Sequence, residues 1–176
     1  VGGSQGANFV SSSACDAILQ LPQEIRQKVK VLHQCRKEDV LEVKNKYDAQ
    51  NIDSNINVFF DNISFCLNKA HLVISRAGAS SLSELCIFGR HSILIPLPSA
   101  VGNHQALNAS VMKKSGASMV LNQSKMTSSK LSKQIKYIIG NPKIANDMAN
   151  SAKRLSKPDA AINFVNKLDE FKRETL

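Results

Sequence analysis

Short apolar runs alternate along this chain with longer amphipathic stretches, from residue 8 to residue 121. Runs of this length, rich in Val, Ile and Leu, are typical of buried strands. We expect strands over 28–35, 56–60, 71–75, 91–97 and 117–121. The stretches between them predict helices over 8–21, 36–50, 61–69, 103–114, 128–139, 143–155 and 160–172, with a further helix that ends near Gly89.

Strands that alternate with helices indicate a parallel sheet, because each crossover helix returns the chain to the same end of the sheet. The fold class is therefore α/β, a Rossmann-like parallel sheet with helices on both faces. A chain of 176 residues with 43% hydrophobic content fits one such domain. Ligands of this fold lie across the carboxyl ends of the strands, so the loops at that edge are the candidate site.

One candidate loop reads Arg-Ala-Gly-Ala-Ser-Ser-Leu-Ser-Glu, from Arg76 to Glu84, directly after the apolar run at 71–75. A strand, a Gly-containing turn and a helix start form an anion site from backbone N–H groups. The same residues also fit a capping box, with Ser81 as the N-cap and Glu84 reaching back to its N–H. The local pattern leaves the phosphate site and the capping box both open.

A second candidate loop lies at the start of the chain, where Gly2-Gly3-Ser4-Gln5-Gly6 follows the single residue Val1. Glycines let backbone N–H groups approach a ligand closely, and Ser4 adds a hydroxyl donor. The glycine spacing matches neither the dinucleotide fingerprint nor the P-loop with its Lys. A plain strand-to-helix turn is the alternative, and in either case we expect a strand upstream of Val1.

The net charge is +9, and +6 of it falls from Ser124 onward, where 11 basic residues face 5 acidic ones. Such a surface suits a phosphorylated ligand, an anionic membrane or simple solvation. Aromatic residues make up only 5% and no Trp or nucleic-acid motif is present, so we expect no nucleic-acid partner.

Neither a metal nor a cofactor is expected. The four cysteines form no C-x-x-C pair and no metal-ligand spacing, so reduced thiols are predicted. No signal peptide or membrane-spanning run is visible, which predicts a cytosolic type of chain. No nucleophile, base and orienting group are recognisable together, so no catalytic residue is predicted here.

Three motifs occur in one order: Gly-Gly-Ser-Gln-Gly-Ala at the start, Arg-x-Gly-Ala-x-x-x-x-Glu from Arg76, and His-Gln-x-x-Asn-Ala from His104. Together they resemble the C-terminal half of the bacterial peptidoglycan N-acetylglucosaminyltransferases, which convert lipid I to lipid II. The likeness covers nearly the whole chain. It implies one half of a GT-B glycosyltransferase, with UDP-N-acetylglucosamine as the donor.

The resemblance also implies different roles for the two domains of the enzyme. Residues 1–157 would form the donor-binding domain, and 158–176 a C-terminal helix that packs towards an N-terminal domain. That N-terminal domain, absent here, would bind lipid I and supply the base for inverting transfer to the muramoyl C4 hydroxyl. We therefore expect negligible transfer by this chain alone. The implied location is peripheral, at the cytoplasmic face of the bacterial inner membrane, with contact to anionic lipid.

The roles that the resemblance implies for single residues all concern the donor. Arg76 would support either its own loop or the phosphates, and the two roles stay open. Contacts to the diphosphate are implied for Gly3, Ser4, Gln5, Ala79, Ser80 and Ser81. Contacts to the nucleoside and the sugar are implied for Phe59 over the uracil, the Phe60 backbone at its edge, Glu84 at the ribose, and His104 and Gln105 at the N-acetylglucosamine.

Two other interpretations stay open. The chain could be a natural donor-binding subunit that pairs with a separate, membrane-attached acceptor subunit. It could instead be a non-catalytic nucleotide-binding module or a dinucleotide oxidoreductase domain. The oxidoreductase requires a different glycine spacing and an acidic residue that the sequence does not show at the expected place.

Overall fold

The computed structural model describes residues 7–98 and 100–175, and the predicted site residues Gly3, Ser4 and Gln5 lie outside this part. Its strands all pair in parallel, as two hydrogen-bonded sheets, one of order β1-β2 and one of order β3-β4-β5. The strands are β1 (Lys30–Gln34), β2 (Asp53–Asn57), β3 (Val73–Ser75), β4 (Ser92–Leu94) and β5 (Ser118–Val120).

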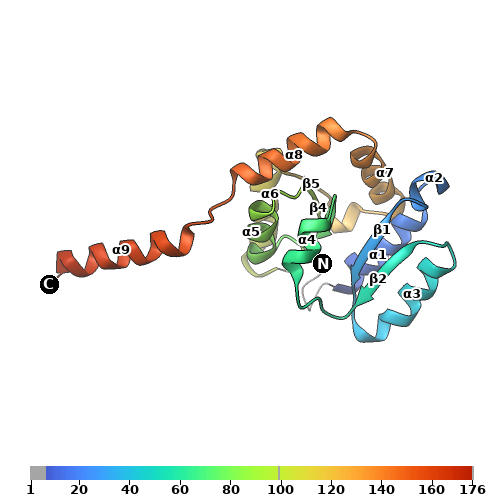
Figure 1. Cartoon of the computed structure of the whole chain (residues 1–176), viewed down its shortest axis with the longest axis horizontal. Helices are drawn as coiled ribbons and strands as arrows, with labels where there is room; N and C mark the ends of the chain where they lie inside the picture. Colours follow the sequence, from blue (N-terminus) through green and yellow to red (C-terminus); the bar gives the residue numbers. More distant parts are fainter. Residues whose placement is uncertain (1–6, 99, 176) are drawn as a thin grey trace.

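Helices surround both sheets (Figure 1). Short 3-10 turns at Lys37–Asp39, Val101–Asn103 and Gln123–Lys125 precede three of the helices. The α-helices are α1 (Ala7–Leu19), α2 (Gln23–Arg26), α3 (Val40–Asp48), α4 (Ile63–Lys69), α5 (Ala79–Ile87), α6 (His104–Lys114), α7 (Ser128–Ile139), α8 (Pro142–Arg154) and α9 (Ala160–Thr175).

Strand β4 separates two apolar cores. Ile93 and Ile95, on either side of Leu94 in the chain, belong to a core built mainly with α1, β1, α3 and α7. Leu94 belongs to the other core, together with residues of α5, α6 and α8. All three side chains are fully buried. Successive side chains of a strand point to opposite faces, so helices cover both faces of this sheet, as predicted.

The second strand differs from its prediction. Residues 56–60 were expected to form it, whereas β2 covers Asp53–Asn57 and leaves Val58, Phe59 and Phe60 beyond its carboxyl end. β2 pairs only with β1 among the described strands and is partly exposed along its length, so polar residues such as Asp53 and Asn55 are tolerated there. The apolar run that suggested the strand is therefore largely the loop that follows it.

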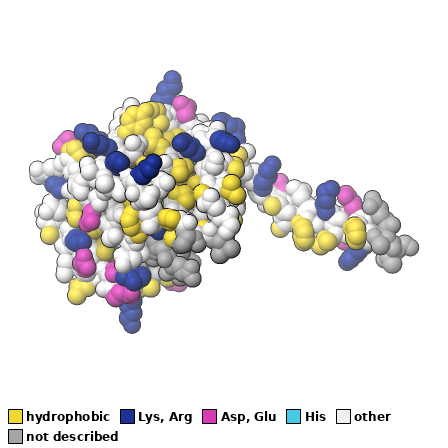
Figure 2. Space-filling model, turned by 180° about the vertical axis from the view of Figure 1, so that it is seen from behind, with side chains coloured by type: hydrophobic (Ala, Val, Ile, Leu, Met, Phe, Trp, Pro, Cys, Tyr) yellow, Lys and Arg dark blue, Asp and Glu magenta, His cyan; other side chains and the backbone are white. Residues whose placement is uncertain are grey.

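Helix α9 extends away from the rest of the molecule (Figure 1). Its side chains are exposed over residues 160–172. Phe164, Val165 and Leu168 lie on one face of the helix, and hydrophobic side chains line one side of it in Figure 2. Within the described residues, no helix has both the length and the hydropathy to cross a bilayer.

A buried polar chain links α1, β1 and α3. Ser11 Oγ lies 2.7 Å from His33 Nε2, and the Tyr47 hydroxyl lies 2.9 Å from His33 Nδ1, both as hydrogen bonds. His33 is 6% exposed and Tyr47 is fully buried. Burial disfavours the charged imidazolium and lowers the pKa of His33 to about 4. The fold therefore contains a neutral histidine between two hydroxyl groups.

We expect this histidine to make stability depend on pH. Because the folded pKa lies below the ordinary value of about 6.5, the unfolded chain takes up a proton first as the pH falls. The free energy of unfolding should therefore be highest above pH 6.5 and fall by about 3 kcal/mol towards pH 4. Urea unfolding at a series of pH values measures this decline.

His33→Phe and His71→Gln separate this effect from other titrations. His33→Phe should lower stability at neutral pH and flatten the decline between pH 6.5 and 4. Burial also lowers the pKa of His91, so a smaller decline of the same sign should remain. His71 is exposed, and its charge is one of the smaller causes that lower the pKa of His91, so His71→Gln should change the decline much less than His33→Phe does. If the free energy of unfolding of His33→Phe falls with pH as steeply as before, the decline is not caused by His33.

Candidate active site

Helix α5 starts after a three-residue loop that follows β3, and no side chain makes a capping hydrogen bond to it. Gly78 is its N-cap residue, with φ −68° and ψ 144°, and no side chain caps the helix. Its carbonyl accepts the first intrahelical bond, from the Leu82 N–H at 3.0 Å. The N–H groups of Ala79, Ser80 and Ser81 therefore have no acceptor within the helix.

This geometry overturns the capping-box interpretation. Ser81 is the third residue of α5 rather than its N-cap, because the backbone is already helical from Ala79. Glu84, expected as the box partner, lies in the second turn and is half-buried. An uncapped helix start carries a partial positive charge and exposed donors, which is the arrangement that binds anions.

Open space lies beside Gly78. A Cβ added to Gly78 would meet no atom of the described residues within 4 Å. Its φ of −68° is accessible to any residue, so the backbone conformation does not require glycine here. The absence of a side chain instead leaves the space beside this N-cap residue open among the described residues.

Two amide side chains from α6 hold the backbone of Ala77. Gln105 Oε1 accepts from Ala77 N at 3.3 Å and from Leu97 N at 3.1 Å. Asn108 Nδ2 donates to Ala77 O at 3.1 Å. Since both partners of Gln105 are donors, its oxygen is the atom they contact, and the Nε2 group is left as the donor end. Three chain segments are thus fixed relative to each other.

Arg76 also forms hydrogen bonds to the loop after β4. Its side chain is 5% exposed, and Nη1 donates to Ile95 O at 3.0 Å and to Pro96 O at 3.2 Å. The guanidinium carbon lies 6.0 Å from the centre of the Phe9 ring in α1. Burial lowers the pKa of Arg76. Arg76 therefore holds the loop after β4, and its two predicted roles, at its own loop and at the phosphates, stay predictions.

The remaining described site residues of the prediction lie at the start of α6 and in the loop after β2. His104 is the first residue of α6 and is exposed. Phe59 is 69% exposed and Phe60 is half-buried, both just after β2. A large exposed aromatic ring in a loop at the carboxyl end of a strand is available to stack on a ligand.

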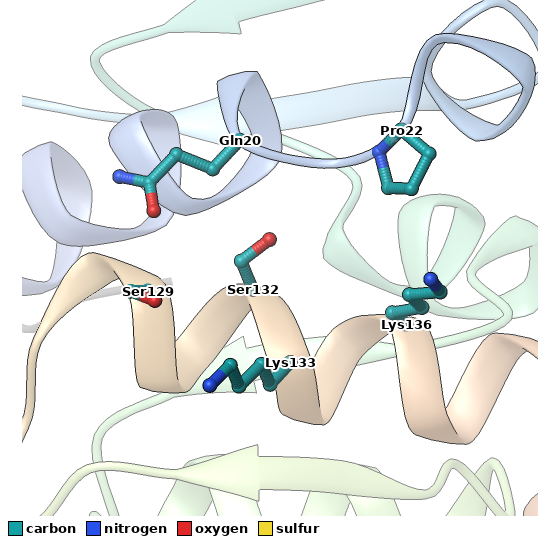
Figure 3. Close-up of a pocket in the computed structure, with 6 residues that line it drawn as sticks. All are labelled: Gln20, Pro22, Ser129, Ser132, Lys133 and Lys136. Atoms are coloured by element: carbon teal, nitrogen blue, oxygen red, sulfur yellow. The ribbon is translucent and has the colours of Figure 1, made fainter.

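A separate cavity of about 200 Å³ lies between the end of α1 and α7 (Figure 3). None of the predicted site residues lines it, and its polar side chains come from Gln20, Ser129, Ser132, Lys133 and Lys136. The candidate site is therefore defined by the uncapped helix and its loops rather than by this cavity. Over the described residues, no group of three His, Cys, Asp or Glu is placed to hold a metal ion.

A family model described as the glycosyltransferase family 28 C-terminal domain matches residues 1–164 of the chain. The chain belongs to this family.

Relatives of this family 28 domain include two UDP-N-acetylglucosamine--N-acetylmuramyl-(pentapeptide) pyrophosphoryl-undecaprenol N-acetylglucosamine transferases. The Wolbachia sp. subsp. Brugia malayi (strain TRS) protein is 36% identical over 165 residues, 94% of this chain and 48% of that protein. The Paramagnetospirillum magneticum protein is 37% identical over 161 residues, 92% and 43% respectively. The chain thus spans about half the length of the curated relatives that it matches.

Solved structures agree with this assignment. The crystal structure of Acinetobacter baumannii MurG superposes with a TM-score of 0.84 at 28% identity, over 97% of this chain and 48% of that one. The glycosyltransferase VinC, solved in complex with dTDP, gives a TM-score of 0.65 at 13% identity over 90% of this chain, which is a likeness of fold alone. The predicted α/β fold, as one half of a GT-B glycosyltransferase, is confirmed.

Sequence reasoning missed the structural part of the His-Gln-x-x-Asn motif in this family 28 domain. Asn108 was not among the predicted site residues, and Gln105 was assigned only to the sugar. Their contacts with Ala77 span 31 and 28 residues. The signal that could have indicated a loop contact is a pair of amide side chains three residues apart at a helix start. Residues at this spacing lie on one face of a helix.

We expect Gln105 to contribute to the stability of the family 28 domain. Gln105→Leu leaves the N–H groups of Ala77 and Leu97 without their acceptor, and Ala77 is fully buried. The free energy of unfolding should fall by about 1–3 kcal/mol. Urea unfolding measures the change, with Gln50→Leu at an exposed position as the control. Equal effects of the two substitutions would show that the contacts of Gln105 do not hold the loops.

Proposed function

We propose that this chain is the donor-binding half of an inverting glycosyltransferase. The donor is UDP-N-acetylglucosamine, and the full reaction transfers N-acetylglucosamine to the muramoyl C4 hydroxyl of lipid I, which gives lipid II. The observation that supports this proposal is the uncapped start of α5, which lies next to the open space at Gly78. The names of the two relatives contain the same donor sugar and a pyrophosphoryl-undecaprenol acceptor.

The diphosphate would lie at the N-terminus of α5. The N–H groups of Ala79, Ser80 and Ser81 would donate to its oxygens, and the helix dipole places positive potential there. Negative charge develops on the departing UDP as the glycosidic bond breaks, so donors already oriented towards it stabilise the transition state more than the ground state. The predicted contacts of Gly3, Ser4 and Gln5 belong to the same proposal.

The nucleoside and the sugar would extend from the diphosphate to either side. Phe59 would stack on the uracil, with the Phe60 backbone at the edge of the base. Glu84, half-buried in the second turn of α5, would accept hydrogen bonds from the ribose hydroxyls. Gln105 Nε2 and His104 would hold hydroxyls of the N-acetylglucosamine. The proposed base acts from the other half of the enzyme, so no catalytic residue is assigned here.

Helix α9 would pack on that other half. The proposed division places the donor domain at 1–157 and this helix within 158–176. The exposed apolar face of Phe164, Val165 and Leu168 supports the proposal, because amphipathic helices owe most of their stability to packing of that face.

We propose a peripheral location at the cytoplasmic face of the bacterial inner membrane, where a lipid-linked acceptor is reached. Helix α7 carries Lys130, Lys133 and Lys136 and no acidic residue. Figure 2 shows Lys and Arg side chains around an apolar patch on the main body of the molecule. Each such charge near anionic lipid contributes about 1 kcal/mol. Lipid I itself would be bound by the other half.

Calorimetric titration with UDP-N-acetylglucosamine, UDP-N-acetylgalactosamine and UDP tests the donor proposal. We expect the N-acetylglucosamine donor to bind more tightly than its N-acetylgalactosamine epimer. Glu84→Ala should weaken binding about ten- to hundredfold, since hydrogen bonds to a charged group contribute about 1.5–3 kcal/mol. Glu24→Ala, on α2 and exposed, is the control and should bind normally. Equal affinity of Glu84→Ala and the unsubstituted chain would refute the ribose contact.

Gly78→Ala is the second variant in the same titration. Its methyl group would enter the open space beside Gly78, so UDP should bind about tenfold more weakly. The free energy of unfolding should fall by about 0.5–2 kcal/mol, the cost of losing a favourable N-cap residue. Unaltered UDP affinity of Gly78→Ala would place the diphosphate elsewhere.

A further inference from the structure

The carbonyl of Ala77 is held by a side chain from a different helix. Asn108 is the fifth residue of α6 and half-buried, and its Nδ2 donates to Ala77 O at 3.1 Å. Ala77 itself is fully buried. A buried carbonyl with a partner of this kind has a fixed direction, because losing the bond would leave the oxygen unsatisfied.

That direction also determines where the next N–H group points. Ala77 C=O and Gly78 N–H belong to one peptide unit, which is planar, and in a trans peptide the two groups point in opposite directions. With the oxygen turned towards α6, the Gly78 N–H points away from α6. Within residues 7–98 and 100–175, this N–H has no hydrogen-bond acceptor.

Gly78 is also the N-cap residue of α5, and the space at its Cβ position is open among the described residues. Asn108 thus orients the N–H group of Gly78. The N–H groups of Ala79, Ser80 and Ser81 follow it directly in the chain. Successive backbone N–H groups that converge on one point form an anion-binding concavity. A rotated peptide plane would replace one of these donors by a carbonyl oxygen, which repels phosphate.

We propose that Asn108 is a positioning residue for the donor diphosphate. It acts through the Ala77–Gly78 peptide plane, which it holds so that the Gly78 N–H donates to a phosphate oxygen. The inference rests on the proposed donor site, and it extends that site by a fourth backbone donor. Asn108 itself contacts Ala77 rather than the phosphate.

Asn108→Leu removes the donor while keeping the approximate size of the side chain and adding no charge. We expect this substitution to weaken UDP binding about tenfold, the effect of one hydrogen bond. The affinity for uridine, which lacks phosphate, should stay within twofold of the value for the unsubstituted chain. Calorimetry measures the affinity for UDP, and ligand-observed NMR measures the affinity for uridine. Asn146→Leu, exposed on α8, is the matched control and should leave both affinities unchanged.

Equal weakening of UDP and uridine would reduce Asn108 to a general structural role and overturn the inference, as would unchanged UDP affinity. Absence of UDP binding by the unsubstituted chain would instead refute the proposed donor site, and the inference with it.

A measurement on the unsubstituted chain keeps the test independent of how well the variants fold. In ¹⁵N NMR spectra, the Gly78 amide signal should shift on titration with UDP and stay in place with uridine. A Gly78 signal that ignores UDP, in a chain that binds UDP, would overturn the inference.

Discussion

The pair of hydrogen bonds on Ala77 is the constraint on which the site depends. Gln105 holds the N–H of Ala77 and Asn108 holds its carbonyl, so one buried residue is fixed on both sides by α6. Gln105 also holds Leu97 N, which joins the loop after β4 to the same point. Because α5 starts two residues after Ala77, its free N–H groups have a defined position without any contribution from their own side chains.

The two cores make this constraint rigid. Arg76 donates to the carbonyls of Ile95 and Pro96, and Ile95 is fully buried in the core that α1, β1, α3 and α7 share. Ala77 belongs to the other core, with α5, α6 and α8. Arg76 and Ala77, which are neighbours in one loop, are thus held by different cores. Such a loop can present backbone donors to an anion with little reorganisation, which is the property that electrostatic stabilisation of a leaving group requires.

Periodicity was sufficient to predict most of the fold. The alternation of apolar runs and amphipathic stretches located every strand approximately, and α7 covers the predicted 128–139. The polar strand β2 was misplaced, because an edge strand need not be apolar. Ser81 was misjudged as a possible cap, because Ser near a helix start satisfies the capping pattern even when the N-cap residue lies three positions earlier, as Gly78 does. The contacts of Arg76 with Ile95 and Pro96, and those of Gln105 and Asn108 with Ala77, join residues 19 to 31 positions apart, and no local pattern encodes them.

A crystal structure of this chain with UDP-N-acetylglucosamine is the most direct test of the central claim. The account predicts the diphosphate within hydrogen-bonding distance of the N–H groups of residues 78–81, with Asn108 still bonded to Ala77. Diphosphate bound elsewhere, for example in the cavity lined by Gln20, Ser132 and Lys136, would contradict it.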